Sequence, residues 1–251
     1  MSGLVTGRPS EGQARPRRRE RRSRPGVARS LASPSLLTAG PGAIRRPPMD
    51  PRRIVLVAMP CREIVEIGGV LDIFSAAGQL LARDGGRRSG YAVEVVSPVV
   101  AVRVWTGLRL VADRSYRDVR GPIDTLIVTG VDGPAEARRD PDLVRWLARV
   151  ARRCRRVVGL CTASYLLAEA GLLDGRTATT HWMDCDEFAR RYPKVRVRRD
   201  PIYVRDGPVY TSAGATAGLD LVLALVEEDL GRRLALQVAQ RMVLYLRRPG
   251  G

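Results

Sequence analysis

The sequence has one histidine, His181, one lysine, Lys194, and only four cysteines in 251 residues. The cysteines lie at irregular intervals, at Cys61, Cys154, Cys161 and Cys185. These intervals match no zinc-site spacing, so a metal site of cysteine and histidine ligands is excluded, and no cofactor is predicted. Irregular spacing without a secretory signal indicates free thiols in a reducing compartment, and a cytoplasmic location is expected.

Long apolar runs are also absent. None reaches the roughly 18 residues that would predict a membrane span, and no membrane partner is expected. The stretch 31–44 is interrupted by proline and glycine and cannot be the apolar core of a secretory signal. The hydrophobic fraction of 45% is nevertheless ordinary for a globular protein, which excludes a chain that is disordered throughout.

Acidic residues are scarce relative to arginine, and the formal net charge is +17. Residues 1–50 hold 11 arginines and three acids among Pro, Gly and Ser, without apolar periodicity, which predicts a disordered basic tail. This tail has several interpretations: a transit peptide, a nucleic-acid-binding arm, or an extension without a specific role. Alternatively, translation begins at Met49 and the tail is not part of the protein. The remaining excess is spread over helix faces such as 138–156, so direct nucleic-acid binding by the folded part is not expected.

From Arg53 onward, apolar strand-length segments alternate with helical periodicity. Strands are expected at 54–59, 91–96, 123–128, 157–160 and 177–180, with hairpins at 102–111 and 202–211. Helices are expected at 67–82, 141–153, 162–170, 184–191, 219–230 and 234–246. This order predicts an α/β three-layer sandwich with a mostly parallel central sheet, in one domain over residues 51–248.

One segment, Gly159-Leu160-Cys161-Thr162-Ala163, joins a buried strand to a helix. Small residues two positions before and after Cys161 are typical of a nucleophile elbow, a tight turn with a strained central residue. The helix N-terminus is expected to lower the pKa of Cys161, and the Thr162 amide to face a developing oxyanion. The alternative is a buried structural cysteine.

Three ordered segments carry a family resemblance. They are 161–175, beginning Cys-Thr-Ala-Ser-Tyr, 179–182, reading Thr-Thr-His-Trp, and 210–220, reading Tyr-Thr-Ser-Ala-Gly-Ala-Thr-Ala-Gly-Leu-Asp. The chain resembles the ThiJ/PfpI superfamily, which implies a flavodoxin-like, class I glutamine amidotransferase-like fold. Its branch is the one that contains isonitrile hydratases and the sensor domains of AraC-type transcription regulators.

The resemblance implies roles for four residues. Cys161 matches the reactive cysteine, and Thr162 matches the residue that follows it in hydratase-like members. Glu66 matches an acid that sits against the cysteine and relays a proton. The alternative for Glu66 is a helix-start acid favoured by the dipole. His181 is the only ring able to titrate near neutrality, and it is either a base near the pocket or a structural histidine.

The chain also departs from the family pattern. The loop containing Gly130 and Val131 should supply a second oxyanion amide, but it lacks the adjacent glycines that are common there. No histidine follows His181, so an amidotransferase triad is incomplete, and the Thr at position 162 stands where family proteases have His. Glutaminase and protease activities are therefore not expected.

These observations favour two functions. The first is a small-molecule sensor domain like those of AraC-type regulators, without their helix-turn-helix, for which the sequence leaves no room after residue 248. The second is an isonitrile hydratase-like lyase with Cys161 as nucleophile and Glu66 as proton relay. A cysteine-based stress protein is a third. A second copy of the chain is expected as partner.

Overall fold

The computed structural model describes residues 50–60, 63–83 and 90–244. The tail predicted over residues 1–50, apart from Asp50, lies outside the described residues. So do Met49, Cys61 and the last residues of the predicted domain.

A seven-stranded sheet forms the centre, in the order β10-β11-β7-β6-β1-β2-β5. Its strands are β1 (Arg52–Val57), β2 (Tyr91–Ser97), β5 (Arg114–Ser115), β6 (Thr125–Val128), β7 (Arg156–Gly159), β10 (Tyr203–Asp206) and β11 (Val209–Ser212). Every neighbouring pair is parallel except β10 and β11. The predicted mostly parallel sheet is confirmed.

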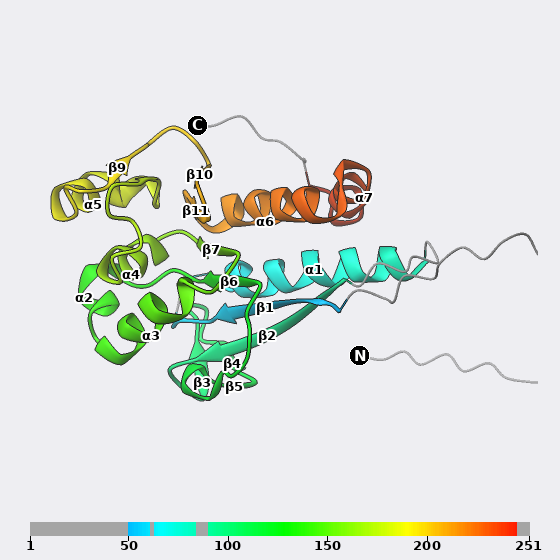
Figure 1. The fold of residues 1–251 in the computed structure, drawn as a ribbon, viewed down its shortest axis with the longest axis horizontal. Helices are drawn as coiled ribbons and strands as arrows, with labels where there is room; N and C mark the ends of the chain where they lie inside the picture. Colours follow the sequence, from blue (N-terminus) through cyan, green and yellow to red (C-terminus); the bar gives the residue numbers. More distant parts are fainter. Residues whose placement is uncertain (1–49, 61–62, 84–89, 245–251) are drawn as a thin grey trace, which may run out of the picture. The chain divides into compact units, whose positions relative to one another are not determined.

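Helices cover both faces of this sheet. Helices α1 (Val65–Arg83), α6 (Ala215–Leu230) and α7 (Arg232–Met242) pack together, and α2 (Gly133–Ala137), α3 (Pro141–Ala151), α4 (Ala163–Glu169) and α5 (Cys185–Arg191) form the other group (Figure 1). Alternate residues of β1 divide the core: Ile54 and Leu56 join the first group, Val55 and Val57 the second. The predicted three-layer sandwich is therefore confirmed.

Among the described helices, α1 alone has the length and mean hydropathy, 1.4, of a membrane span. It also contributes core residues such as Val70, Ile73 and Phe74 to the packing against α6 and α7. Core helices of water-soluble proteins meet the same criteria, so the length and composition of α1 are weak evidence for a membrane span.

Two small sheets complete the fold. Strands β3 (Ala101–Arg103) and β4 (Arg109–Val111) form the first predicted hairpin, and β10 and β11 form the second. Strand β8 (Thr177–Ala178) pairs with β9 (Arg196–Val197) rather than with the central sheet. The short helix α2 and the 3-10 helices η1 (Tyr116–Asp118) and η2 (Trp182–Asp184) were not predicted, because such short elements carry no periodicity.

Helix α7 corrects one predicted boundary. The sequence suggested a helix as far as Leu246, but α7 ends at Met242 because Val243 adopts a left-handed conformation with φ 54°. The Leu244 amide donates to the Ala239 carbonyl and closes the last turn.

A buried ionic cluster corrects another expectation. Arg156 was assigned to an exposed basic face, yet its exposed fraction is only 2%. Its guanidinium contacts Asp229, also 2% exposed, and its Nε donates to the Thr125 hydroxyl at 2.9 Å. Tyr91 and Arg155 donate to the same carboxylate at 3.1 and 2.9 Å. This cluster ties the C-terminal end of α6 to β2 and β7.

Candidate functional site

The turn at Cys161 has the geometry of an elbow. It connects the end of β7 at Gly159 to the start of α4 at Ala163, and Cys161 has φ 53°, a conformation that L-residues rarely adopt. A Cβ at Gly159 would lie 2.7 Å from Leu167 Cδ1, so a larger residue at position 159 would require the buried Leu167 side chain to shift. The predicted strain and the need for a small residue are both present.

Glu66 lies opposite this turn, in the first turn of α1, with an exposed fraction of 1%. Its Oε2 accepts a hydrogen bond of 2.7 Å from the Gly130 amide. Its Oε1 is buried and meets no donor at normal hydrogen-bond geometry in the described part of the chain. The Cys161 thiol, 3% exposed, interacts with this carboxyl group. The structure therefore brings together the acid and the thiol that the resemblance paired.

Burial changes the acidity of both groups. It raises the pKa of Glu66 from 4.5 to about 7, against the opposing effects of the Gly130 amide and the Cys161 thiol. Burial, and then the negative charge of Glu66, raise the pKa of the Cys161 thiol well above its ordinary value. The Thr162 amide and hydroxyl oppose this rise but are outweighed. The predicted lowering of the Cys161 pKa is therefore wrong, because desolvation and the charge of Glu66 outweigh the Thr162 groups that favour the thiolate.

In the loop after β6, the backbone amides of Gly130 and Val131 already donate hydrogen bonds to side chains. The Gly130 amide donates to Glu66, and the Val131 amide donates to Thr162 Oγ1 at 3.0 Å. The same Thr162 hydroxyl donates to the Val131 carbonyl at 2.6 Å. Gly130 thus lies against Cys161 and Val131 contacts the neighbouring Thr162, but neither amide is available to an oxyanion in this arrangement.

Gly130 is packed closely against Thr162 and Glu66. Gly130→Ala is therefore expected to lower the free energy of unfolding by about 1–3 kcal/mol. An added Cβ would lie 2.8 Å from Thr162 Oγ1 and 3.2 Å from Glu66 Oε2. Both oxygens are held by hydrogen bonds to this loop, so they cannot move without breaking those bonds. Urea denaturation measures the loss.

Gly68 provides the matched control for this substitution. It lies inside α1 with no atom within 4 Å of an added Cβ. Gly68→Ala is expected to raise stability by up to about 1 kcal/mol through helix propensity. Equal effects of the two substitutions would contradict the crowding at Gly130.

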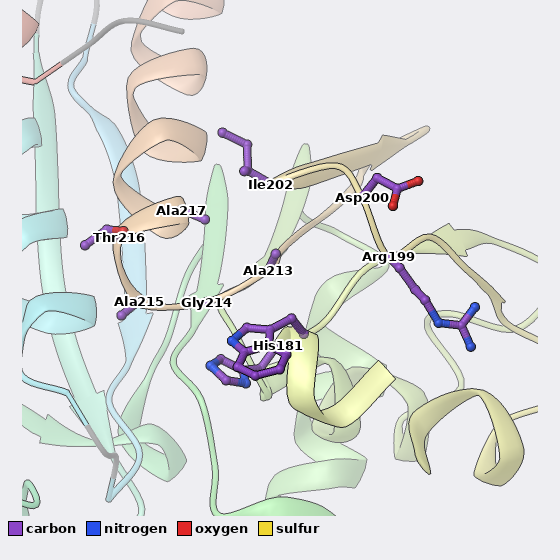
Figure 2. Close-up of a pocket in the computed structure, with 10 residues that line it drawn as sticks. His181, Arg199, Asp200, Ile202, Ala213, Gly214, Ala215, Thr216 and Ala217 are labelled. Atoms are coloured by element: carbon purple, nitrogen blue, oxygen red, sulfur yellow. The ribbon is translucent and has the colours of Figure 1, made fainter. Parts of the chain in front are cut away.

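A cavity of 660 Å³ lies where residues 181–182, 199–202 and 213–217 meet, and His181 is in its wall. Its lining consists of His181, Trp182, Arg199, Asp200, Ile202, Ala213, Gly214, Ala215, Thr216 and Ala217. Figure 2 shows His181 facing the turn at Gly214, while the Arg199 side chain points away from the ring. A Cβ at Gly214 would lie 3.0 Å from His181 Cδ2, and Gly214 has φ 148°. A glycine is therefore required where the cavity wall turns.

His181 also has a local structural role. Its Nδ1 accepts a hydrogen bond of 3.4 Å from the Met183 amide, and Asp184 lies 3.6 Å from the same nitrogen. The ring therefore caps the 3-10 helix η2 as well as lining the cavity.

Cys161 does not line the cavity, although the two share supporting segments. The Cys161 amide donates to Ser212 Oγ at 3.3 Å, and the next residue, Ala213, lines the cavity. Thr180 donates to the Cys161 carbonyl at 3.5 Å and precedes His181. A shift of the backbone in the cavity wall can therefore move Cys161 through its hydrogen bonds with Ser212 and Thr180.

Seven of the ten lining residues lie in the segments 179–182 and 210–220 that carry the family resemblance, but among them only His181 was predicted as a site residue. The signal for Ala213 to Ala217 was the run of small residues that leads from β11 into the first turn of α6, which permits a close approach of backbone to a ligand. Arg199 and Asp200 belong to an irregular segment that carries no pattern, and Ile202 stands at the start of the predicted hairpin 202–211. Within the described ranges, no group of three or more His, Cys, Asp or Glu side chains is arranged to hold a metal ion.

Comparison with known proteins places these features in a family context. The model of the DJ-1/PfpI family matches residues 52–228. The solved structure of a ThiJ/PfpI family protein from Pseudomonas syringae superposes with a TM-score of 0.67 at 25% identity, over 87% of this chain and 84% of that one.

Two curated relatives match shorter segments. The HTH-type transcriptional regulator CdhR of Pseudomonas aeruginosa is 46% identical over 109 residues, which are 43% of this chain and 32% of the regulator. The isonitrile hydratase of Pseudomonas putida is 34% identical over 151 residues, 60% of this chain and 64% of the enzyme. In both cases the match spans less than two thirds of the relative's length.

Proposed function

Because the chain belongs to the DJ-1/PfpI family, we propose that it is a small-molecule-binding domain of the sensor type found in AraC-type regulators. The ligand is proposed to occupy the 660 Å³ cavity lined by His181 and the segment 213–217. Cavities of this size suit small organic molecules. The proposal includes a cytoplasmic location and a second copy of the chain as partner.

The occupied amides beside Cys161 carry this proposal. A nucleophilic mechanism that passes through an oxyanion needs donors pointing at the new charge. Here the Gly130 and Val131 amides are bonded to Glu66 and Thr162 instead. The thiol is buried, and its raised pKa leaves little thiolate at neutral pH. These features favour binding over covalent chemistry.

A cavity-filling variant tests this proposal. Ala215 begins α6 and lines the cavity, so Ala215→Phe should fill part of it. Amino acids, amines and carboxylic acids would be screened for compounds that raise the melting temperature of the full chain. We expect the stabilisation by a binding compound to be lost in Ala215→Phe and retained in Cys161→Ser. A compound whose effect depends on Cys161 but not on Ala215 would contradict the assignment of the cavity.

A second function, isonitrile hydration, is favoured by the Glu66–Cys161 pair. A carboxyl group with a pKa of about 7 is suited to give and take protons near neutrality. In this alternative the Cys161 sulfur adds to the isonitrile carbon while Glu66 supplies the proton. Water then replaces the sulfur and yields the N-substituted formamide.

Product analysis separates the two functions. The full chain and Cys161→Ser would be incubated with cyclohexyl isonitrile, and N-cyclohexylformamide would be measured by chromatography. The sensor proposal expects no formation above the rate without protein. Turnover that disappears in Cys161→Ser would overturn it and establish the hydratase alternative.

A further inference from the structure

A second cavity, of 480 Å³, lies near the N-terminal ends of β6 and β7, whereas Cys161 follows the C-terminal end of β7. It is bounded by Val119–Ile123, the segment before β6, and by α3 with the residues that follow it as far as Cys154. Strand β7 starts at Arg156, just after this cavity, and ends just before Cys161. The two cavities are therefore associated with opposite ends of the strands.

We infer that this second cavity is a binding site for a small organic anion with a flat apolar body, such as an aromatic carboxylate or sulfonate. The inference does not depend on the proposed function. It stands on the apolar floor of the cavity, its arginine rim and its size.

The floor of the cavity is apolar. It is lined by Val119, Ile123, Trp146 and Val150 and by the thiol-bearing Cys154. Trp146 is almost fully buried and stacks at a tilt against Tyr116, with ring centroids 5.4 Å apart, so its position is fixed by packing. A flat hydrocarbon body would replace water on this floor and gain from the apolar area that it covers.

The rim of the cavity is cationic. Arg149 and Arg153 are exposed, and neither forms an ion pair with a described residue. Arg120 stands on the opposite side, where its Nη1 donates to the carbonyls of Arg117 and Val119 at 2.6 and 3.1 Å. Three guanidinium groups thus surround one cavity, and one of them is held in place before any ligand arrives.

The carboxylate of Asp124, which follows the lining segment 119–123, is already neutralised. Asp124 acts on Cys154 through its negative charge, but both of its oxygens accept hydrogen bonds of 2.8 Å from Arg155. Asp118, just before the lining segment, is exposed but does not line the cavity, and the charged residues that line it are all arginines. An anionic ligand can pair with Arg149 and Arg153 without displacing an existing partner.

A pair of dyes tests the inference directly. Anilinonaphthalenesulfonate has the anionic head and flat body expected of the ligand, and phenylnaphthylamine is its neutral counterpart without the sulfonate. Fluorescence titration of the full chain with each dye would be compared between wild type and the double variant Arg149→Gln/Arg153→Gln. We expect the Kd for the sulfonate to rise at least about tenfold in the double variant. The Kd for the neutral dye should change less than about twofold, because it makes no charged contact.

Cys154 reports whether the dye occupies this cavity. Alkylation by iodoacetamide at pH 9, mapped by mass spectrometry, distinguishes Cys154 from the other thiols. The sulfonate should slow the alkylation of Cys154 in wild type and not in the double variant.

Arg152→Gln is the matched control. Arg152 is an exposed arginine next to Arg153 that lies outside this cavity. It should leave the sulfonate affinity unchanged within about twofold. An unchanged affinity in the double variant, an equal loss in Arg152→Gln, or binding that does not protect Cys154 would each overturn the inference.

Discussion

Replacing Arg156 with alanine is expected to lower the free energy of unfolding by about 3–5 kcal/mol, one of the two largest effects that we predict. Arg156 and Asp229 are each only 2% exposed, and their side chains are paired. Without the guanidinium, the Asp229 carboxylate would remain buried beside Tyr91, and its cationic partners among the described residues would be the more peripheral Arg155 and Arg52. Urea denaturation at neutral pH measures the loss.

Two comparisons make this result specific. Lys194→Ala removes an exposed ion pair with Asp174 and should cost at most about 1 kcal/mol. Arg156→Met/Asp229→Leu removes both charges and should recover much of the stability lost in Arg156→Ala. A loss below about 1 kcal/mol in Arg156→Ala would show that the pair contributes no more than a surface contact.

The second large effect concerns the pH dependence of stability. The pKa of Glu66 is raised from 4.5 to about 7 in the folded protein, so ionising the buried carboxyl opposes folding. Its contribution to stability is fully present below pH 4.5 and is lost as the pH rises through 7, a decrease of about 3 kcal/mol. Glu66→Gln cannot ionise and should lack this decrease.

The measurement compares urea unfolding of wild type and Glu66→Gln at pH 4.5 and pH 8.5. The difference between the two proteins should change by about 3 kcal/mol in favour of the variant at the higher pH. The glutamine amide oxygen can keep the hydrogen bond from the Gly130 amide, so the loop remains supported. Glu187→Gln, at an exposed position of α5, should leave the wild-type profile unchanged. Parallel profiles for wild type and Glu66→Gln would refute the raised pKa.

The strands could be predicted because burial on both faces of a parallel sheet leaves an unbroken apolar run in the sequence. Ile54 to Val57 and Leu126 to Val128 are such runs, and both are fully buried. The ends of helices were less predictable. Helix α6 begins at Ala215, before its large apolar residues, and α7 ends at Met242 because the next residue, Val243, is left-handed.

For the candidate site, the sequence placed the elbow correctly but not its chemistry. The small residues around Cys161 dictate a tight turn, and the turn has the strained φ that they imply. The acidity of the thiol depends instead on the balance between desolvation, the charge of Glu66 and the nearby amides. None of these quantities can be deduced from the order of residues around position 161.

The sequence by itself therefore determined the α/β class, the main strands and helices in their order along the chain, and the position of one thiol on a sharp turn. These follow from local periodicity and small-residue spacing, which act over a few neighbouring residues. Only the tertiary structure decided that Thr162 occupies the Val131 amide, that Glu66 titrates near neutrality, and that Arg156 is buried. Those outcomes depend on residues brought together from distant parts of the chain. Burial there removes water and raises the free energy of each ionised group that is not paired.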